Sequence, residues 1–394
     1  MAPVFSTTTL YAPQPCSSRR NQPSLPLTPS VSLSCRNLTL TKLPVPYSIA
    51  RSLKSPARFL TTTSASNPAK ELFPLLQAPD GYREKKRENG DLFPSSKSGQ
   101  SWIDEHLPRQ VQPYARLARL DKPIGTWLLA WPCMWSLSLA ALPGNVPDFK
   151  MICLLGIWAL LSRGAGCTVN DILDVDFDRK VKRTKTRPIA SGNLTPFQGV
   201  CFLAVQLLLG LGILLPLNNY SRILGASYPL LYCTYPLMKR ITYWPQAYLG
   251  LAFNWGALMG WSAVKGSLDP AIVLPLYASG VFWTLVYDTI YAHQDKEDDL
   301  KVGVKSTALR FGDSTKKWIS GFGMACIGNL ALSGFNANLG WPFYAFLAVA
   351  SGQLAWQIWT VDLSSSTDCS RKFVSNNWFG AIIFSGILFG RVWS

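Results

Sequence analysis

Two acidic stretches carry the side chains with the clearest chemical potential. The first reads N-D-I-L-D-V-D-F-D, from Asn170 to Asp178, with Asp171 and Asp174 between them. Residues four apart lie along one face of a helix, so Asn170, Asp174 and Asp178 are predicted to share a face. Carboxylates that share a face repel each other unless a cation lies between them, and oxygen ligands of this kind suit Mg²⁺. The stretch therefore predicts a magnesium site.

The same spacing recurs far downstream. Asp295 and Asp299 repeat the four-residue interval, and Asp288 precedes Asp295 by two helical turns on the same face. Each stretch follows an apolar segment and is itself followed by lysine and arginine. We therefore expect the two stretches to form one site, in which the carboxylates face each other across a diphosphate bridged by Mg²⁺.

Basic residues directly after each acidic stretch are suited to binding phosphate oxygens. Lys182, Arg183 and Arg187 follow the first stretch, and Lys301 and Lys305 follow the second. Because arginine and lysine form charge-assisted hydrogen bonds with phosphate, we interpret these side chains as diphosphate-binding residues. The alternative is that they are ordinary loop charges that orient the chain in a membrane.

Arg163 lies inside an apolar segment, seven residues before Asn170. At 1.5 Å per residue it is roughly 10 Å deeper along the same helix face. A charged side chain within a membrane span is costly and usually functional, so we expect it to meet an anionic group of a substrate. The alternative is an ion pair with a carboxylate of another helix. Further candidates to line the site are Tyr235, Lys239, Arg240, Tyr287 and Tyr291.

At these residues the chain resembles the UbiA family of intramembrane aromatic prenyltransferases. The resemblance lies in N-D-x-x-D-x-x-x-D from Asn170 to Asp178 and in D-x-x-x-D from Asp295 to Asp299. The chain is similar in particular to the mitochondrial 4-hydroxybenzoate polyprenyltransferases of ubiquinone synthesis. That similarity includes L-D-K-P-I-G-T-W-L-L-A-W-P-C, which begins at Leu120. The resemblance covers residues 102–394, which we assign to one transmembrane prenyltransferase domain.

The resemblance implies a fold and an activity. The fold would be all-α, with nine transmembrane helices around a central cavity. The activity would be Mg²⁺-dependent transfer of a polyprenyl group from an all-trans polyprenyl diphosphate to 4-hydroxybenzoate, at the ring carbon ortho to the hydroxyl. No redox cofactor is implied. Association with other enzymes of ubiquinone synthesis is also expected.

The resemblance also implies roles for individual residues. Arg163 and Asn170 would bind the aromatic acid, and the four aspartates of the repeated spacing would be catalytic. Two Mg²⁺ ions would be held by a set of oxygen ligands that comprises Asn170, Asp171, Asp174, Asp178, Asp288, Asp295 and Asp299.

The net charge of +16 is unevenly distributed along the chain. The first 70 residues hold eight lysines and arginines and no acidic residue, and they are rich in Ser, Thr and Pro. This composition is typical of a mitochondrial or other organelle transit peptide, which we place at 1–67, followed by a flexible linker at 68–101. The remaining cations flank apolar segments. They indicate a lipid bilayer and a phosphorylated substrate rather than nucleic acid.

Nine apolar blocks follow an amphipathic stretch at 102–120. Each block is long enough to cross the hydrocarbon core of a bilayer. The predicted spans are 124–142, 149–170, 197–216, 219–237, 245–264, 271–292, 318–335, 341–361 and 374–392. The alternative is eight spans with one re-entrant block.

The distribution of lysine and arginine between the predicted loops orients the chain. One side collects the basic residues that follow both acidic stretches, whereas the other side has only Lys150, Arg222, Lys265 and Arg391. Because basic residues stay on the inner side, the N-terminus and both aspartate loops are predicted to face the mitochondrial matrix. The protein would then be a multi-pass protein of the inner membrane.

Three other functions remain open. A plastid enzyme of prenylquinone or chlorophyll synthesis would share the fold, although the sub-motifs favour 4-hydroxybenzoate. A geranyl-specific 4-hydroxybenzoate transferase of secondary metabolism would share the site. An ion transporter could also carry intramembrane carboxylates, but the acidic clusters here lie at the ends of apolar segments beside cations, which favours an enzyme.

Overall fold

The computed structural model describes residues 101–394. The predicted transit peptide (1–67) lies outside the described residues, as does all of the predicted linker (68–101) except its last residue. Both remain predictions.

Within the described part of the chain, every regular element is helical, which confirms the predicted all-α fold. The first half contains α1 (Trp102–His106), α2 (Gln112–Leu117), α3 (Ile124–Leu139), α4 (Phe149–Leu173), α5 (Val175–Asp178), α6 (Pro196–Leu214), α7 (Asn219–Ile241), α8 (Pro245–Phe253) and α9 (Gly256–Lys265). The second half contains α10 (Pro270–Ala292), the 3₁₀ turn η1 (His293–Asp295), α11 (Lys296–Val302), α12 (Thr307–Phe311), the 3₁₀ turn η2 (Gly312–Ser314), α13 (Thr315–Asn336), α14 (Trp341–Thr360) and α15 (Ser366–Val392).

Local sequence signals explain where several long helices begin. Asp148 precedes α4, and its side chain accepts a hydrogen bond from the backbone N–H of Lys150 at 2.9 Å. Asp269 does the same for α10 through Ala271, and Pro270 occupies the first helical position. A short acidic side chain satisfies an amide that has no partner within the helix, and proline fits the first turn.

Each predicted apolar block falls in helix, with one block divided. The block at 245–264 is split between α8 and α9 around Asn254. The side chain of Asn254 donates to the Gly250 carbonyl at 2.8 Å and to Thr284 Oγ1 of α10 at 3.0 Å. A polar side chain that bonds to its own backbone competes with the helical pattern, which accounts for the break.

Five of the described helices are long and apolar enough to cross a membrane by themselves. They are Phe149–Leu173, Pro196–Leu214, Pro270–Val302, Thr307–Asn336 and Ser366–Val392. Pro270–Val302 comprises α10, η1 and α11, and Thr307–Asn336 comprises α12, η2 and α13. Others, such as the 16-residue α3 and the divided α8 and α9, are shorter. The predicted count of nine crossings therefore stays a prediction.

Tryptophan packing joins α3, α10 and α15 in the core. Trp135 donates from Nε1 to the Gly380 carbonyl at 2.9 Å, and Trp283 donates from Nε1 to Asn376 Oδ1 at 2.8 Å. The two indole rings lie 5.2 Å apart. On the other side of α3, Gly260 of α9 approaches so closely that a Cβ would lie 2.5 Å from the Cys133 carbonyl oxygen. Small residues permit such close helix contacts.

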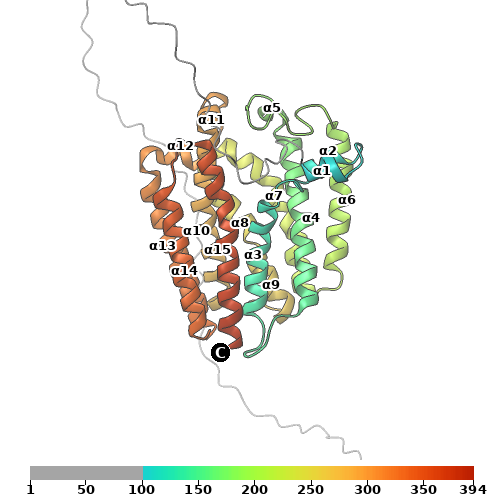
Figure 1. Cartoon of the computed structure of the whole chain (residues 1–394). Coiled ribbons are helices and arrows are strands. Elements are labelled where there is room, and N and C mark those ends of the chain that lie inside the picture. Colours follow the sequence, from blue (N-terminus) through green and yellow to red (C-terminus); the bar gives the residue numbers. More distant parts are fainter. Residues whose placement is uncertain (1–100) are drawn as a thin grey trace, which may run out of the picture. The chain divides into compact units, whose positions relative to one another are not determined.

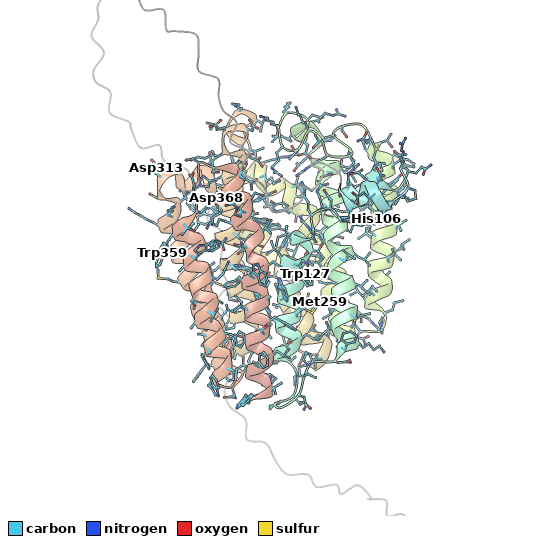
Figure 2. All side chains as sticks on the ribbon, viewed as in Figure 1. His106, Trp127, Met259, Asp313, Trp359 and Asp368 are labelled. Atoms are coloured by element: carbon cyan, nitrogen blue, oxygen red, sulfur yellow. The ribbon has the colours of Figure 1, made fainter. Side chains whose placement is uncertain are left out.

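The acidic stretches gather at one end of the long helices (Figure 1). α5 and α11 lie at this end, and the Lys182 backbone amide contacts Asp298 Oδ2 at 3.4 Å across the two loops. In Figure 2, Asp313 and Asp368 lie toward the same end, whereas Trp127 and Met259 lie farther along the helices. The C-terminal end of α15 lies at the opposite end (Figure 1).

Candidate active site

The first acidic stretch spans the end of α4 and the whole of α5. Asp174 has non-helical backbone angles (φ −101°, ψ 12°) and separates the two helices. The helix is therefore not continuous here, yet the three predicted side chains still come together. Asn170 Nδ2 donates to Asp174 Oδ2 at 2.8 Å, and Arg187 Nη1 donates to Asn170 Oδ1 at 3.3 Å and to Asp178 Oδ2 at 2.7 Å. Lys239 Nζ and Arg240 Nη2, both from α7, lie 3.7 and 3.2 Å from the carboxylate of Asp174. These cations hold the carboxylate at the break between α4 and α5.

The second acidic stretch also crosses a change of helix. Asp288 belongs to α10, Asp295 ends the 3₁₀ turn η1, and Asp299 belongs to α11. A 3₁₀ turn is tighter than an α-helix, so the predicted single face is interrupted here as well. All three carboxylates nevertheless line the same cavity.

That cavity has a volume of about 600 Å³ and lies between α3, α4, α7, α8 and α10. Asn170 of the first stretch lines it together with the three aspartates of the second. The structure thus brings side chains from two distant stretches to one space. The other predicted site residues that line it are Arg163, Arg183, Arg187, Tyr235, Lys239, Tyr287, Tyr291 and Lys305.

Six predicted site residues do not line this cavity, and they are Asp171, Asp174, Asp178, Lys182, Arg240 and Lys301. Lys182 and Lys301 are exposed, and Lys301 Nζ lies 3.7 Å from Asp298. Arg240 stacks over Phe177 at 4.9 Å. Their placement puts these basic side chains on the loop surface around the cavity rather than in its wall.

Most aspartates of the two stretches are paired with cations. Arg187 Nη1 lies 2.7 Å from Asp178 Oδ2, and Arg183 donates from Nε to both oxygens of Asp295 at 2.9 Å. Among residues 101–394, no three acidic, histidine or cysteine side chains converge closely enough to hold one metal ion. Guanidinium groups pair with these carboxylates instead, and the site in which the carboxylates face each other across a diphosphate bridged by Mg²⁺ stays a prediction.

Burial shapes the charge of this network. Burial raises the pKa of Asp178, and the neighbouring Arg187 guanidinium only partly opposes this shift. Burial also disfavours the charged form of Arg183, but the hydrogen bonds to Asp295 outweigh it, so the pKa of Arg183 is raised. Arg183 is therefore a cation that the Asp295 carboxylate neutralises.

Asp171, which the sequence predicts as a metal ligand, is turned away from the cavity. Its side chain is 1% exposed and accepts two hydrogen bonds from Arg119 Nη2, at 2.7 and 3.0 Å. Arg187 Nη1 lies 3.3 Å from the same carboxylate. A buried carboxylate between two guanidinium groups positions those groups, and both arginines line the cavity.

Arg119 is a cavity residue that the sequence analysis did not single out. It adopts a left-handed backbone conformation (φ 59°), which is unusual for a residue with a side chain. Such conformations persist where the surroundings hold them, and they often mark functional sites. Its position directly before the L-D-K-P-I-G run was the one sequence feature that could have indicated a role. Its partner Asp171 is 52 residues away, so no local pattern connects the two.

Arg163 lines the deeper part of the cavity. Its guanidinium lies over the ring of Phe253 at 5.3 Å. Among the described residues, Nε is buried without a hydrogen-bond partner, and the side chain forms no ion pair within 4 Å. The described part of the chain thus contains no ion pair between Arg163 and another helix, which was the alternative to substrate binding. The group is left able to meet an anion.

The three predicted tyrosines line the cavity wall. Tyr291 accepts a hydrogen bond from Arg183 Nη1 at 3.1 Å, and Tyr287 accepts one from Thr284 at 3.0 Å. Lys239 lies over the ring of Tyr235 at 5.2 Å. These rings form an apolar wall beside the charged groups, which favours exclusion of water.

The donors that face the cavity fit a hard divalent cation. Asp288 is half-buried, lines the cavity and has no hydrogen-bond or ion-pair partner among the described residues. Carboxylate oxygens of Asp295 and Asp299 and the side-chain amide of Asn170 line the same space. Carboxylate and amide oxygens, completed by phosphate oxygens, are the ligands that Mg²⁺ takes.

Comparison with known proteins agrees with this fold. The chain belongs to the UbiA prenyltransferase family, whose family model matches residues 129–383. This confirms the resemblance drawn from the sequence motifs.

Two curated relatives and one solved structure illustrate the match. The chain is 75% identical over 291 residues to 4-hydroxybenzoate polyprenyltransferase, mitochondrial, of Arabidopsis thaliana, covering 74% of this chain and 72% of that protein. It is 62% identical over 292 residues to 4-hydroxybenzoate geranyltransferase 2 of Lithospermum erythrorhizon, covering 74% and 95%. The apo structure of a UbiA homolog from Aeropyrum pernix K1 has a TM-score of 0.57 at 21% identity, covering 66% and 96%, so it shares the fold.

Proposed function

We propose that the chain transfers a polyprenyl group from an all-trans polyprenyl diphosphate to 4-hydroxybenzoate. The products are 3-polyprenyl-4-hydroxybenzoate and diphosphate, in the synthesis of ubiquinone. The observation that carries this proposal is the single cavity, in which motif carboxylates and loop cations lie at one end and Arg163 lies deeper without a partner. High identity to a protein named for this reaction supports it.

Two Mg²⁺ ions complete the site in this proposal. Asn170, Asp288, Asp295 and Asp299 would hold metal from the cavity wall. Asp174 would join them from the break between α4 and α5, and Asp178 from the end of α5. Bound there, the metal neutralises the diphosphate and stabilises it as the leaving group.

The basic residues are placed to change partners when the diphosphate binds. Arg183, Arg187 and Lys239 all line the cavity, and each is now paired with a motif aspartate. Phosphate oxygens offer the same charge-assisted hydrogen bonds. These side chains would therefore move from the carboxylates to the diphosphate and leave the carboxylates free for metal.

The aromatic acid is held deeper in the cavity. Its carboxylate meets the Arg163 guanidinium, which has two parallel N–H donors for a carboxylate, and Asn170 lies toward the diphosphate. This arrangement points the phenol end of the ring at the reacting carbon of the prenyl chain. The phenol oxygen donates electrons to the ortho ring carbon, which becomes the nucleophile.

The reaction breaks one bond and forms another. The prenyl C1–O bond breaks with its electron pair leaving on the diphosphate, and the allylic cation is shielded from water by Tyr235, Tyr287 and Phe253. Electrons of the ring form the new carbon–carbon bond. The ring proton then passes to a motif aspartate or to the departing diphosphate, and aromaticity is restored.

The location follows from the same features. We place the protein in the mitochondrial inner membrane with both aspartate loops toward the matrix, because basic residues gather around those loops. Association with other ubiquinone-synthesis enzymes is part of this proposal, since the prenylated product remains in the bilayer.

A second candidate is favoured by one observation, which is the 62% identity to a protein named 4-hydroxybenzoate geranyltransferase. Membranes containing the chain would be incubated with 4-hydroxybenzoate, Mg²⁺ and prenyl diphosphates of increasing length. Efficient transfer of long chains supports the polyprenyl assignment. Transfer of geranyl alone would replace it with the second candidate, and no transfer of any prenyl group would overturn both.

A further inference from the structure

Because Gly125 has no side chain, the Arg163 guanidinium can occupy the space beside it. It is the second residue of α3, it is buried, and it lines the cavity. A Cβ at this position would lie 2.5 Å from Arg163 Nε, 2.6 Å from Nη2 and 2.8 Å from Cζ. The three nearest heavy atoms thus all belong to one guanidinium group, and real Cβ atoms do not approach so closely.

The location of that guanidinium depends on packing alone. The guanidinium lies over the Phe253 ring of α8 at 5.3 Å, and Gly125 of α3 also borders it. No carboxylate among the described residues holds it, and Nε has no hydrogen-bond partner there. A side chain on Gly125 would therefore displace the group without breaking an ion pair.

We propose that Gly125 is a positioning residue, which acts through Arg163 and sets where the carboxylate of the aromatic acid is bound. This inference rests on the proposed role of Arg163. A planar guanidinium recognises a carboxylate through two parallel hydrogen bonds, so its position and tilt fix the position of the acid. Displacement of the group moves the ring away from the reacting prenyl carbon, while the diphosphate end of the cavity is unchanged.

The substitution Gly125→Ala tests this inference with little risk to folding. Alanine is the better helix former, and the atoms it meets are the end of a flexible side chain. We expect the KM for 4-hydroxybenzoate to rise about tenfold, because the displaced guanidinium loses one charge-assisted hydrogen bond to the substrate carboxylate. The KM for the prenyl diphosphate should be unchanged. The control is Gly156→Ala on α4, where the nearest atom is Met134 Cε at 3.6 Å.

A double mutant separates positioning of Arg163 from other effects. In an Arg163→Ala background, Gly125→Ala should have no further effect on the KM for 4-hydroxybenzoate, because the group it displaces is gone. Effects that multiply would overturn the inference, as would an unchanged KM in Gly125→Ala or loss of that variant from the membrane. Absence of turnover in the wild type would instead refute the proposed function, so the two failures are distinguishable.

Discussion

Replacement of Arg163 tests the assignment of the aromatic acid to the deeper part of the cavity. Hydrogen bonds to charged groups contribute about 1.5–3 kcal/mol. Loss of one such bond corresponds to a factor of roughly 10 to 150 at about 1.4 kcal/mol per factor of ten. Because Arg163→Ala removes both bonds to the carboxylate, it should raise the KM for 4-hydroxybenzoate by at least this factor. Arg163→Lys keeps the charge but loses the planar fork, so its effect should lie at the low end of this range.

The Arg163→Ala protein should still accumulate in the membrane. Arg163 has no ion-pair partner among the described residues, so its removal leaves no buried carboxylate unpaired. What is lost is the contact with Phe253, which contributes about 1–2 kcal/mol for a partly desolvated pair. Arg222→Ala is the matched control, since Arg222 is exposed and does not line the cavity.

The assay measures initial rates in membranes with each substrate varied in turn. The KM for the prenyl diphosphate should change little in the Arg163 variants. A methyl ester of 4-hydroxybenzoate, which lacks the negative charge, should reduce the difference between the wild type and Arg163→Ala. Equal loss of affinity for both substrates, or a variant that fails to accumulate, would assign Arg163 to structure and refute the reasoning.

Three further predictions follow from the same geometry. Asp174→Ala and Asp295→Ala should abolish turnover while the protein still inserts, and substantial Mg²⁺-dependent activity in either would contradict the two-stretch site. Cysteines placed at Ser191 and Ser267, both exposed, should react with an impermeant reagent from opposite sides of the membrane, and labelling from a common side would refute the topology. Asp171→Asn should lower stability by about 3 kcal/mol, because it leaves the Arg119 guanidinium without its carboxylate and removes one of the two carboxylates beside Arg187. An unchanged melting temperature would contradict that role.

The sequence predicted the helical blocks well where apolar length alone decides them. The block predicted at 271–292 forms α10, Pro270–Ala292, and the block at 341–361 forms α14, Trp341–Thr360. The division of the block at 245–264 was not predicted, because it depends on Asn254 meeting Thr284 of a different helix. The break at Asp174 likewise coincides with contacts to α7 that a local pattern does not contain.

The candidate site was predicted in part of its composition but not in its pairing. The four-residue spacings correctly indicated that Asn170 and Asp295 lie near one space, although the stretches are far apart in the chain. The spacing could not reveal that Arg183 pairs with Asp295, or that Asp171 is buried against Arg119. Those pairings depend on how the loops fold over the cavity, which single-sequence periodicity does not specify.

The central claim is that both acidic stretches serve one transfer reaction in one cavity. The most direct measurement is the stoichiometry of the reaction in reconstituted membranes that contain the purified chain, 4-hydroxybenzoate, a polyprenyl diphosphate and Mg²⁺. We expect diphosphate and 3-polyprenyl-4-hydroxybenzoate to form in equal amounts, and both to be lost when the divalent metal is chelated. Release of diphosphate without prenylated acid, or a prenyl group attached elsewhere than ortho to the hydroxyl, would contradict it.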